Sequence, residues 1–271
     1  MSDYVLGTAA AELARLQFQQ EVWGQISADF LDRLDVVQGA RALDLGTGPG
    51  LMLPSLLRKV GTHGRVLALD QSPAWRAQLQ QVIAQEGPGQ VDLAFERVED
   101  FAPRPESFDL IFARWVFCYL ADPKAVVARL AQALKPGGIL AIQDYNHEGL
   151  SLFPECESFA TIVRATRAMH QHSGGDVWIA ARIPELFHDA GLALVDYRPH
   201  VLAGTPSSPA YRWADSFFTL HAQSMFTLGL VTAAELERFR QDWAQHKAHA
   251  TSVFFSPILV DCAGRKPGPI T

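Results

Sequence analysis

The sequence predicts an α/β protein built on a mainly parallel β-sheet with helices on both faces. The first 145 residues contain five short apolar runs, separated by segments long enough to form helices. These runs are almost continuously apolar, which is typical of strands buried on both faces. Two of the intervening segments begin with a capping side chain followed by proline, a helix-start signal. With 271 residues, 48% of them hydrophobic, the chain can bury a substantial core.

The predicted elements start with helices and continue with strands. Residues 1–40 are expected to form two helices, one capped by Thr8 and one around residues 26–34. The expected strands are Arg41–Gly46, Arg65–Asp70, Val91–Phe95, Phe108–Ala113 and Gly138–Asp144.

Three helices are expected between these strands. The first covers Leu51–Lys59, after a glycine-rich turn. Ser72-Pro73 and Asp122-Pro123 each combine an N-cap with proline at the first helical position. The third helix is predicted to end at Lys135–Gly138, a stop and turn before the fifth strand.

The chain beyond Asp144 loses this alternation. Residues 146–176 are expected to be largely helical without a strand, and Thr232 with Glu235 predicts a capping box. The other expected elements are helices at Ile179–Ala190, Ala210–Leu230 and Ala233–His249, strands at Leu192–Arg198 and Val253–Gly264, a loop at Thr205–Pro209 and a polar tail at Lys266–Thr271.

We expect one domain over residues 1–271. Its core is predicted at about 35–145, 178–200 and 250–266, and its cap helices at about 1–34, 146–177 and 205–249. The cap would lie above the carboxyl edge of the sheet, where open α/β sheets bind ligands.

Composition limits the partners and the location. The net charge of −6 argues against a broad phosphate-binding surface, so no nucleic acid partner is expected. No apolar run is long enough to cross a membrane, and residues 1–10 lack the features of a secretion signal. Cys118, Cys156 and Cys262 are far apart and form no C-x-x-C pair, which indicates reduced thiols in a cytoplasmic protein. The sequence leaves a homodimer open.

The segment Ala42–Gly50, ALDLGTGPG, lies between an expected strand and an expected helix, as a nucleotide-binding turn does. Its G-x-G-x-G spacing differs from the G-x-G-x-x-G of dinucleotide sites. A carboxylate at Asp44 would repel a pyrophosphate but suits the ammonium and sulfonium of S-adenosylmethionine. Asp70, at the end of the second strand, can accept hydrogen bonds from two ribose hydroxyls. Asp70 alone would also fit NAD; together with Asp44 it favours S-adenosylmethionine.

These segments resemble the ordered motifs of class I S-adenosylmethionine-dependent methyltransferases, in the branch that includes the ubiquinone/menaquinone-biosynthesis enzymes. ALDLGTGPG is similar to motif I and Leu69–Pro73 to motif II. Ser107–Arg114 followed by Leu120–Pro123 resembles the fourth-strand motif, and Leu134–Leu140 the turn before strand five. The resemblance covers about residues 40–145 and continues weakly through 183–191. It implies a Rossmann-like, seven-stranded sheet in the order 3-2-1-4-5-7-6, with strand 7 antiparallel and a helical cap.

The resemblance also implies roles for individual residues. The implied cofactor-binding residues are Asp44, Gly46, Thr47, Gly48 and Arg114 at the methionine end, Asp70 at the ribose, and Gln71, Val98 and Glu99 at the adenine. The family often has an acidic residue at the adenine amino group where this chain has Arg97. Arg114 could instead be a structural ion-pair residue. Arg15 could reach the cofactor carboxylate as a lid residue, although a solvated helix face is the interpretation we favour.

The segment after the fifth strand is expected to face the acceptor. Methyl transfer from a sulfonium is an in-line displacement, so positioning and desolvation can supply much of the rate. His147 is the candidate general base, because the unperturbed pKa of histidine is near 6.5, and Tyr145 could orient the acceptor. Either could instead be a hydrogen-bonded loop residue. A few of the aromatic residues of the cap are expected to line an apolar acceptor pocket, with the rest in the core: Phe153, Phe159, Trp178, Tyr211, Trp213, Phe217, Phe218 and Phe226.

The sequence therefore predicts methyl transfer from S-adenosylmethionine to a small molecule. Ala113–Val116 stands where amino-methyltransferases of adenine or glutamine have an N/D-P-P-Y/F tetrad, which argues against that chemistry. No metal is expected, because neither His170 with His172 nor His246 with His249 has an evident third ligand. The alternative is a protein that binds S-adenosylmethionine structurally or uses the pocket for other chemistry on a natural product. An NAD-dependent oxidoreductase is disfavoured by the glycine spacing and Asp44.

Overall fold

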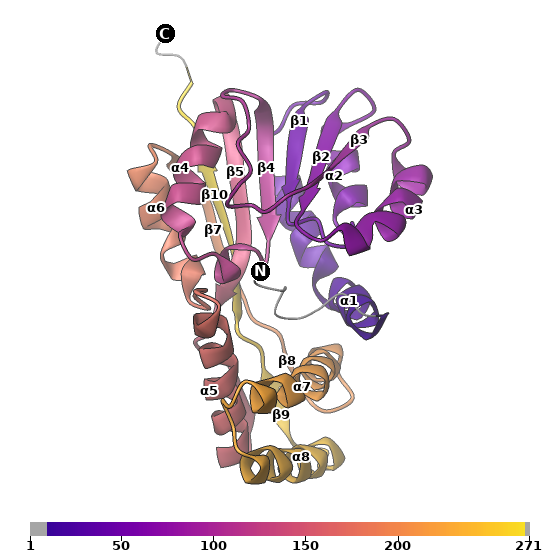
Figure 1. Ribbon diagram of the computed structural model, residues 1–271, viewed down its shortest axis with the longest axis vertical. Helices are drawn as coiled ribbons and strands as arrows, with labels where there is room; N and C mark the ends of the chain where they lie inside the picture. Colours follow the sequence, from indigo (N-terminus) through magenta and orange to yellow (C-terminus); the bar gives the residue numbers. More distant parts are fainter. Residues whose placement is uncertain (1–9, 269–271) are drawn as a thin grey trace.

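The computed structural model describes residues 10–268, and its main element is a seven-stranded sheet (Figure 1). The strand order is β3-β2-β1-β4-β5-β10-β7, which confirms the predicted order, because β7 and β10 are the predicted strands 6 and 7. β10 runs antiparallel to both its neighbours, and the first five strands pair in parallel. The strands are β1 Arg41–Leu45, β2 Arg65–Asp70, β3 Val91–Phe95, β4 Phe108–Arg114, β5 Leu134–Asn146, β7 Ala193–His200 and β10 Ile258–Arg265.

Helices cover both faces of this sheet. α1, α2 and α3 share an apolar cluster with one face, and α4 and α6 share another with the opposite face. The helices are α1 Ala10–Arg33, α2 Leu53–Val60, α3 Arg76–Glu86, α4 Pro123–Ala133 and α6 Ile183–Asp189, with 3₁₀ turns η1 Pro73–Trp75, η2 Phe117–Tyr119 and η3 Ile179–Ala181. Both faces are thus buried, which explains why the strands are apolar without alternation.

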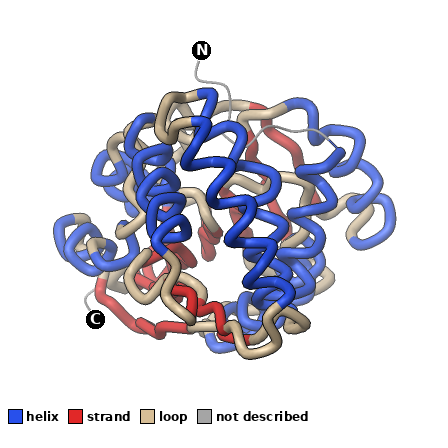
Figure 2. Tube along the Cα trace, turned by 90° about the horizontal axis from the view of Figure 1, so that it is seen from below, coloured by secondary structure: helices blue, strands red, loops and turns tan. Residues whose placement is uncertain are grey.

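A cap of three helices and a small sheet lies at one end of the large sheet, in the lower part of Figure 1. Seen from below, its helices stand in front of most of the strands (Figure 2). Its elements are α5 Glu157–His172, α7 Pro209–Thr227, α8 Ala233–Ala248, β6 Ser151–Phe153, β8 Ala203–Gly204 and β9 Val253–Phe255. Trp23 of α1 belongs to the same apolar cluster as the cap helices, so α1 packs against both parts of the protein.

Several predicted elements are confirmed. β2 and β3 have the predicted bounds. The side chain of Asp122 accepts a hydrogen bond from the Ala125 backbone N–H at the start of α4. Thr232 and Glu235 form the predicted capping box of α8. These features depend on residues close together in the chain, so local patterns were enough to predict them.

Two expected helical segments are divided differently in the structure. The first forty residues form one helix within the described part, α1, and Thr8 lies outside the described residues. α1 continues through Gly24 because Trp23, Phe30 and Leu31 are all buried, and this burial outweighs a glycine cost of about 1 kcal/mol. Residues 179–190 form a 3₁₀ turn and the short helix α6 rather than one helix.

The strand predictions also need corrections. β5 begins at Leu134, so the expected turn at residues 135–138 belongs to the strand and makes an irregular register with β4. The expected final strand is divided into β9 and β10, because Pro257 has no backbone N–H for a ladder and Ser256 bonds Leu202 instead. β6 lies in a segment where no strand was expected, and its pairing with β9 is a long-range contact.

The 3₁₀ turn η1 replaces the predicted helix start at Ser72. The side chain of Ser72 makes no capping bond, and its backbone N–H donates to Asp70 instead. Within residues 10–268, we find no helix with the length and apolar character that a bilayer crossing requires.

Candidate functional site

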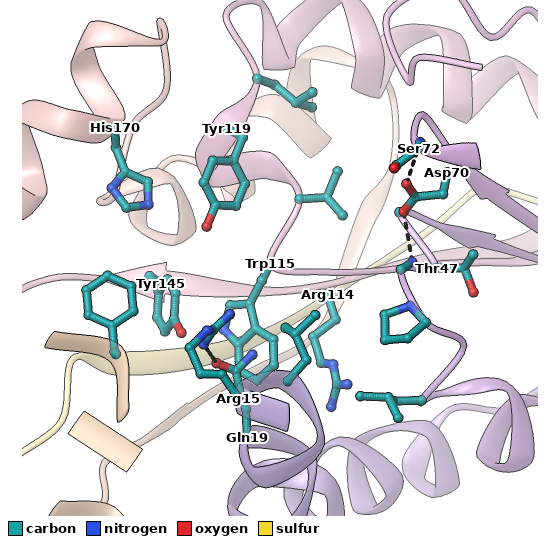
Figure 3. Close-up of a pocket in the computed structure, with 18 of the residues that line it drawn as sticks. Arg15, Gln19, Thr47, Asp70, Ser72, Arg114, Trp115, Tyr119, Tyr145 and His170 are labelled. Atoms are coloured by element: carbon teal, nitrogen blue, oxygen red, sulfur yellow. Dashed lines mark hydrogen bonds between the residues drawn. The ribbon is translucent and has the colours of Figure 1, made fainter. Parts of the chain in front are cut away.

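One cavity runs from the carboxyl ends of β1, β2 and β4 into the cap. Asp70 lies at one end of it and His170 at the other, with Arg114 and Trp115 between them (Figure 3). This cavity is lined by every residue that the sequence predicted as cofactor-binding or catalytic: Asp44, Gly46, Thr47, Gly48, Asp70, Gln71, Val98, Glu99, Arg114, Tyr145 and His147. The structure therefore brings together side chains from five strand ends or following loops.

Asp70 is held by backbone N–H groups on both sides. Its Oδ2 accepts from Gly48 at 2.8 Å and its Oδ1 from Ser72 at 2.8 Å, as the dashed lines of Figure 3 mark. Burial raises the pKa of Asp70, and these two hydrogen bonds oppose the rise. Each carboxylate oxygen retains a lone pair, so the fixed carboxylate can accept two further hydrogen bonds from a diol.

The glycine turn has two kinds of glycine. Gly46 has a φ of +72°, and an added Cβ would lie 2.4 Å from Cγ2 of Val116, so packing against Val116 leaves no room for a side chain. Gly48 has a φ of +53°, and its Cβ would meet no atom within 4 Å. The backbone at Gly48 therefore borders open space inside the cavity, as a close ligand would require.

Asp44 is a buried carboxylate at the end of β1. Thr47 Oγ1 donates to its Oδ2 at 2.6 Å. Burial raises the pKa of Asp44 to about 6, while the Thr47 hydrogen bond and the nearby Arg114 cation lower it. A buried carboxylate with this pKa is stabilised by a cation, so the site fits the ammonium of a methionine moiety.

Arg114 lies at the end of β4 and points toward α1 (Figure 3). Its Nη1 donates to Ser27 Oγ at 3.0 Å and its Nη2 to Gln20 Oε1 at 2.7 Å. Burial lowers the pKa of Arg114 to about 10, against the effect of Asp44, so it remains a cation at neutral pH. Its acceptors are neutral, which leaves its charge available to an anionic group in the cavity.

The end of the cofactor half where the adenine is expected is more exposed to solvent than the end with Asp44. Gln71 is exposed and lines the cavity beside Asp70. Val98 and Glu99 line it after β3, and Arg97 makes an ion pair with Glu99, Nη2 to Oε1 at 3.2 Å. Arg97 itself lines the cavity, so an arginine borders the place expected for the adenine.

The predicted acceptor residues lie on the cap side of the cavity. The ring of Tyr145 stacks on that of Trp115, with centroids 5.8 Å apart. His147 is buried and its Nδ1 makes no hydrogen bond within the described residues. Burial, with smaller contributions from His170 and Arg167, lowers the pKa of His147 to about 3, so its imidazole is neutral at physiological pH.

Several residues on this side were missed as site residues by sequence reasoning, among them His170, Tyr119 and Trp115. His170 stacks on Tyr119 with centroids 5.0 Å apart, and its Nδ1 contacts the Thr166 carbonyl at 3.0 Å. A carbonyl can only accept, so Nδ1 carries the proton and Nε2 is the basic nitrogen. Trp115 has a φ of +55°, uncommon for a bulky residue, and its buried indole N–H has no partner among the described residues. The unusual backbone of Trp115 leaves no signal in the sequence.

Arg15 lies in the cavity wall, so our prediction that its side chain lies on a solvated helix face was wrong. Its side chain is buried and makes two hydrogen bonds with Glu12, at 2.8 and 2.6 Å. It also donates to Gln19 at 2.9 Å, which accepts from Trp213 at 3.1 Å. These contacts join the N-terminal half of α1 to α7 in the wall of the cavity.

Three of the four histidines considered as metal ligands in the sequence have other contacts or positions in the structure. His246 Nδ1 lies 3.0 Å from Ser252 Oγ, and His249 lies 3.0 Å from Thr251. His170 is in the cavity described above. Over residues 10–268, we find no group of three or more side chains arranged to hold a metal ion.

The chain matches a known protein family. A family model described as a methyltransferase domain matches residues 43–142, which contain the glycine turn, Asp70 and Arg114. A ubiquinone biosynthesis O-methyltransferase from Xylella fastidiosa is 30% identical over 173 residues, 63% of this chain and 68% of that protein. A trans-aconitate 2-methyltransferase from Methylobacterium nodulans is 36% identical over 118 residues, 43% of each chain.

The fold also has solved counterparts. A methyltransferase of Bacillus halodurans superposes with a TM-score of 0.60 at 17% identity, covering 89% of this chain and 98% of that one. At this identity the superposition concerns the fold alone.

Proposed function

This chain belongs to the family of S-adenosylmethionine-dependent methyltransferases, and it transfers the methyl group to a small molecule. We propose that the methyl acceptor is an oxygen atom of an uncharged or anionic small molecule. The acceptor would lie on the cap side of the cavity, beside Trp115 and Tyr145. The observation that carries this proposal is the chemistry of the cavity wall on that side.

The cofactor half of the cavity fits S-adenosylmethionine. Asp70 would hold the ribose hydroxyls, and Asp44 and Arg114 would face the ammonium and carboxylate of the methionine moiety. The open backbone at Gly48 supports a ligand in direct contact with the turn. Bound there, S-adenosylmethionine supplies a methyl group already activated on a sulfonium.

The acceptor half is aromatic and has no acidic lining residue among those described. The acidic residues of the cavity are Asp44, Asp70 and Glu99, all at the cofactor end. The lining residues on the cap side include Arg15, Gln19, Trp115, Tyr119, Tyr145, His147, Leu150, Thr166, His170, Ser173, Trp213, Ala214, Phe217, Phe218, Phe254 and Pro257. An ammonium would find no carboxylate there, whereas a flat hydroxyl-bearing molecule would find ring faces and basic nitrogens.

His147 is the proposed base. A hydroxyl must lose its proton as it is methylated, and Nδ1 of the neutral imidazole, unpaired among the described residues, can take that proton. The burial that keeps the imidazole neutral also lowers its strength as a base. Its ring centroid lies 5.5 Å from that of Tyr145 and 6.2 Å from that of His170. Tyr145 would orient the acceptor, because its ring is held by Trp115. The relative from Xylella fastidiosa is named as an O-methyltransferase, which supports an oxygen acceptor.

The test is methyl-labelled S-adenosylmethionine with three sets of acceptors. Catechols and other phenols, di- and tricarboxylic acids, and primary to tertiary amines would be compared by label in the product. We expect label in an ether or ester. Transfer to amines alone would contradict the proposed acceptor class, and formation of no S-adenosylhomocysteine with any pool would contradict methyl transfer.

We propose one catalytic unit of sheet and cap in the cytoplasm, without a nucleic acid partner; the net charge of −6 and the free thiols support this. A homodimer is supported by exposed apolar side chains on the edge strand β7, at Leu194, Val195 and Tyr197. Sedimentation equilibrium of the purified protein would test it.

A further inference from the structure

We propose that Ser27, Gln143 and Asp261 form a hydrogen-bond relay that positions the guanidinium of Arg114 at the cofactor end of the cavity. The relay connects strand β10, through its neighbour β5 and helix α1, to that guanidinium. This inference rests on the proposed role of Arg114 toward the cofactor, and it assigns positioning roles to three residues outside the motifs.

The relay follows one row of residues across the sheet. Arg114 of β4 pairs with Gln143 of β5, and Gln143 pairs with Asp261 of β10. Directly paired residues point to the same face of a sheet. α1 covers that face, because Phe30 packs against Phe112, which lies two residues before Arg114, with ring centroids 6.4 Å apart.

The donors and acceptors of the relay have one consistent direction. Gln143 Nε2 donates to Asp261 Oδ1 at 2.6 Å, which turns Gln143 Oε1 the other way. Ser27 Oγ donates to that Oε1 at 2.5 Å, so its lone pairs are left to accept. Arg114 Nη1 donates to Ser27 Oγ at 3.0 Å. A carboxylate at the far end thereby fixes the amide orientation, the hydroxyl rotor and the guanidinium in turn.

Asp261 is fully buried and fully paired. Besides Gln143, it contacts Arg33 Nη2 at 2.6 Å and His200 Nε2 at 2.7 Å. Burying a carboxylate is costly unless its hydrogen bonds are satisfied, and an apolar residue would often be as stable. A fold needing only packing at this point of β10 would not require an acid. The free-energy cost of burying the Asp261 carboxylate supports a role in orienting the polar side chains that it contacts, Gln143 among them.

The end of the relay lies in the cavity wall. Arg114 Nη2 donates to Gln20 Oε1 at 2.7 Å, so two α1 residues hold two guanidinium nitrogens. Arg114 also lines the cavity with Asp44. A guanidinium held this way presents its charge in one orientation, which reduces the ordering cost when an anionic group binds.

A structural alternative makes a different prediction. Arg33 joins α1 to the same end of the sheet through Asp261 and Asp196, the latter at 3.0 Å. If the polar row served only to attach α1, loss of any of these contacts would lower stability and change cofactor affinity to the same degree. Positioning predicts that only the contacts leading to Arg114 affect affinity.

The experiment is a double-mutant cycle with cofactor affinity as the readout. Ser27→Ala and Asp261→Asn are each made in the natural protein and together with Arg114→Met. S-adenosylhomocysteine and S-adenosylmethionine affinities are measured by calorimetry, and ligand-free melting temperatures are recorded in parallel. Asp196→Asn is the matched control, since it removes the charge of the other carboxylate that pairs with Arg33 and leaves the side chains of the relay unchanged.

We expect Ser27→Ala to weaken binding by about tenfold in the natural protein, and Asp261→Asn, which keeps an acceptor oxygen but loses the charge, to weaken it by a smaller factor. Both should weaken binding by less than about twofold in the Arg114→Met protein. Asp196→Asn should leave affinity unchanged. Equal losses in both backgrounds, or a loss with Asp196→Asn matching that of Asp261→Asn, would overturn the relay. Should Asp261→Asn fail to fold, Ser27→Ala alone decides the outcome.

The Arg114→Met protein separates the relay from the proposed role of Arg114. If Arg114→Met binds the cofactor like the natural protein, the proposed role of Arg114 fails. If Arg114→Met binds weakly while Ser27→Ala and Asp261→Asn bind normally, only the relay fails.

Discussion

The hydroxyl of Thr47 lies 2.6 Å from Oδ2 of Asp44 and donates a hydrogen bond to it, inside the turn that follows β1. Both residues are buried, at 7% and 3% exposure, so the carboxylate cannot turn toward bulk water. Its pKa of about 6 reflects a charge that the ligand-free protein stabilises only in part. A cationic ligand would complete that stabilisation, and this makes cofactor binding sensitive to pH.

The affinity for S-adenosylhomocysteine should fall as the pH is lowered from 7 to 5. Asp44 becomes protonated below its pKa of about 6 and no longer attracts an ammonium. Below that pKa the loss should approach about tenfold per pH unit, as for one proton. Calorimetric titration between pH 5 and 8 measures it. Asp44→Asn should bind weakly at pH 7 with a flat profile, and a profile as steep as that of the natural protein would assign the titration to another group.

Asp44→Asn should also raise the ligand-free melting temperature at pH 7. The folded-state pKa of Asp44 is raised from 3.8, so the folded protein binds more protons than the unfolded chain between pH 3.8 and 6. The contribution of this group to stability is therefore present below pH 3.8 and lost as the pH rises through about 6. Melting at pH 5 and 7 tests the sign, and a variant less stable than the natural protein at pH 7 would contradict it.

Asp70→Ala should weaken cofactor binding by at least about tenfold, because two charge-assisted hydrogen bonds to the ribose would be lost. Asp70→Asn keeps an acceptor and should lie in between. Asp70 also accepts from Gly48 and Ser72, so the ligand-free melting temperature should fall modestly in both variants. Paired titrations and melts measure the two effects. A lower melting temperature with unchanged affinity would make Asp70 a purely structural residue.

His147→Gln should lower kcat by about 100-fold or more, which is the range for loss of a general base. The pKa of His147 is about 3, so its imidazole stays neutral and kcat should have no acid limb from this group between pH 5 and 8. The matched control is His221→Gln. His221 is also buried with a pKa lowered to about 3, but it is not among the residues that line the cavity. A large loss with His170→Gln and none with His147→Gln would move the base to His170.

Alanine at Gly46 and at Gly48 should have different effects. Both positions have positive φ, which costs a residue with a Cβ about 1–2 kcal/mol. Gly46→Ala also clashes with Val116, so its ligand-free melting temperature should fall further than that of Gly48→Ala. Gly48→Ala would place a methyl group in open space of the cavity and should mainly reduce cofactor affinity. Melts and titrations of both variants test this, and equal melting temperatures would contradict the packing argument.

Local sequence was sufficient for the cofactor half of the protein. The bounds of β2 and β3 match the prediction because strands buried on both faces give an unbroken apolar run. Asp44 and Asp70 were placed correctly at strand ends, and parallel neighbouring strands bring such ends to the same edge. A strand and the turn that follows it are close together in sequence, so local patterns were enough to predict the cofactor half.

The acceptor half depended on contacts that no local pattern encodes. Trp115 belongs to the site through a left-handed backbone, and His170 comes from a cap helix that could have packed elsewhere. Arg15 faces the cavity because Glu12 neutralises it and α7 covers α1, which helix periodicity alone did not reveal. β9 and β10 separate because Ser256 pairs with the distant Leu202.

The sequence by itself determined the glycine turn and the two carboxylates that follow strands, since each depends on neighbours along the chain. The order of the strands followed from the resemblance to a known family. Only the tertiary structure decided which polar residues meet beneath α1. Ser27 and Gln143 are 116 residues apart, and Gln143 and Asp261 are 118 apart. A hydrogen bond acts over about 3 Å, so such partners exist only once the sheet has formed and α1 has packed across it.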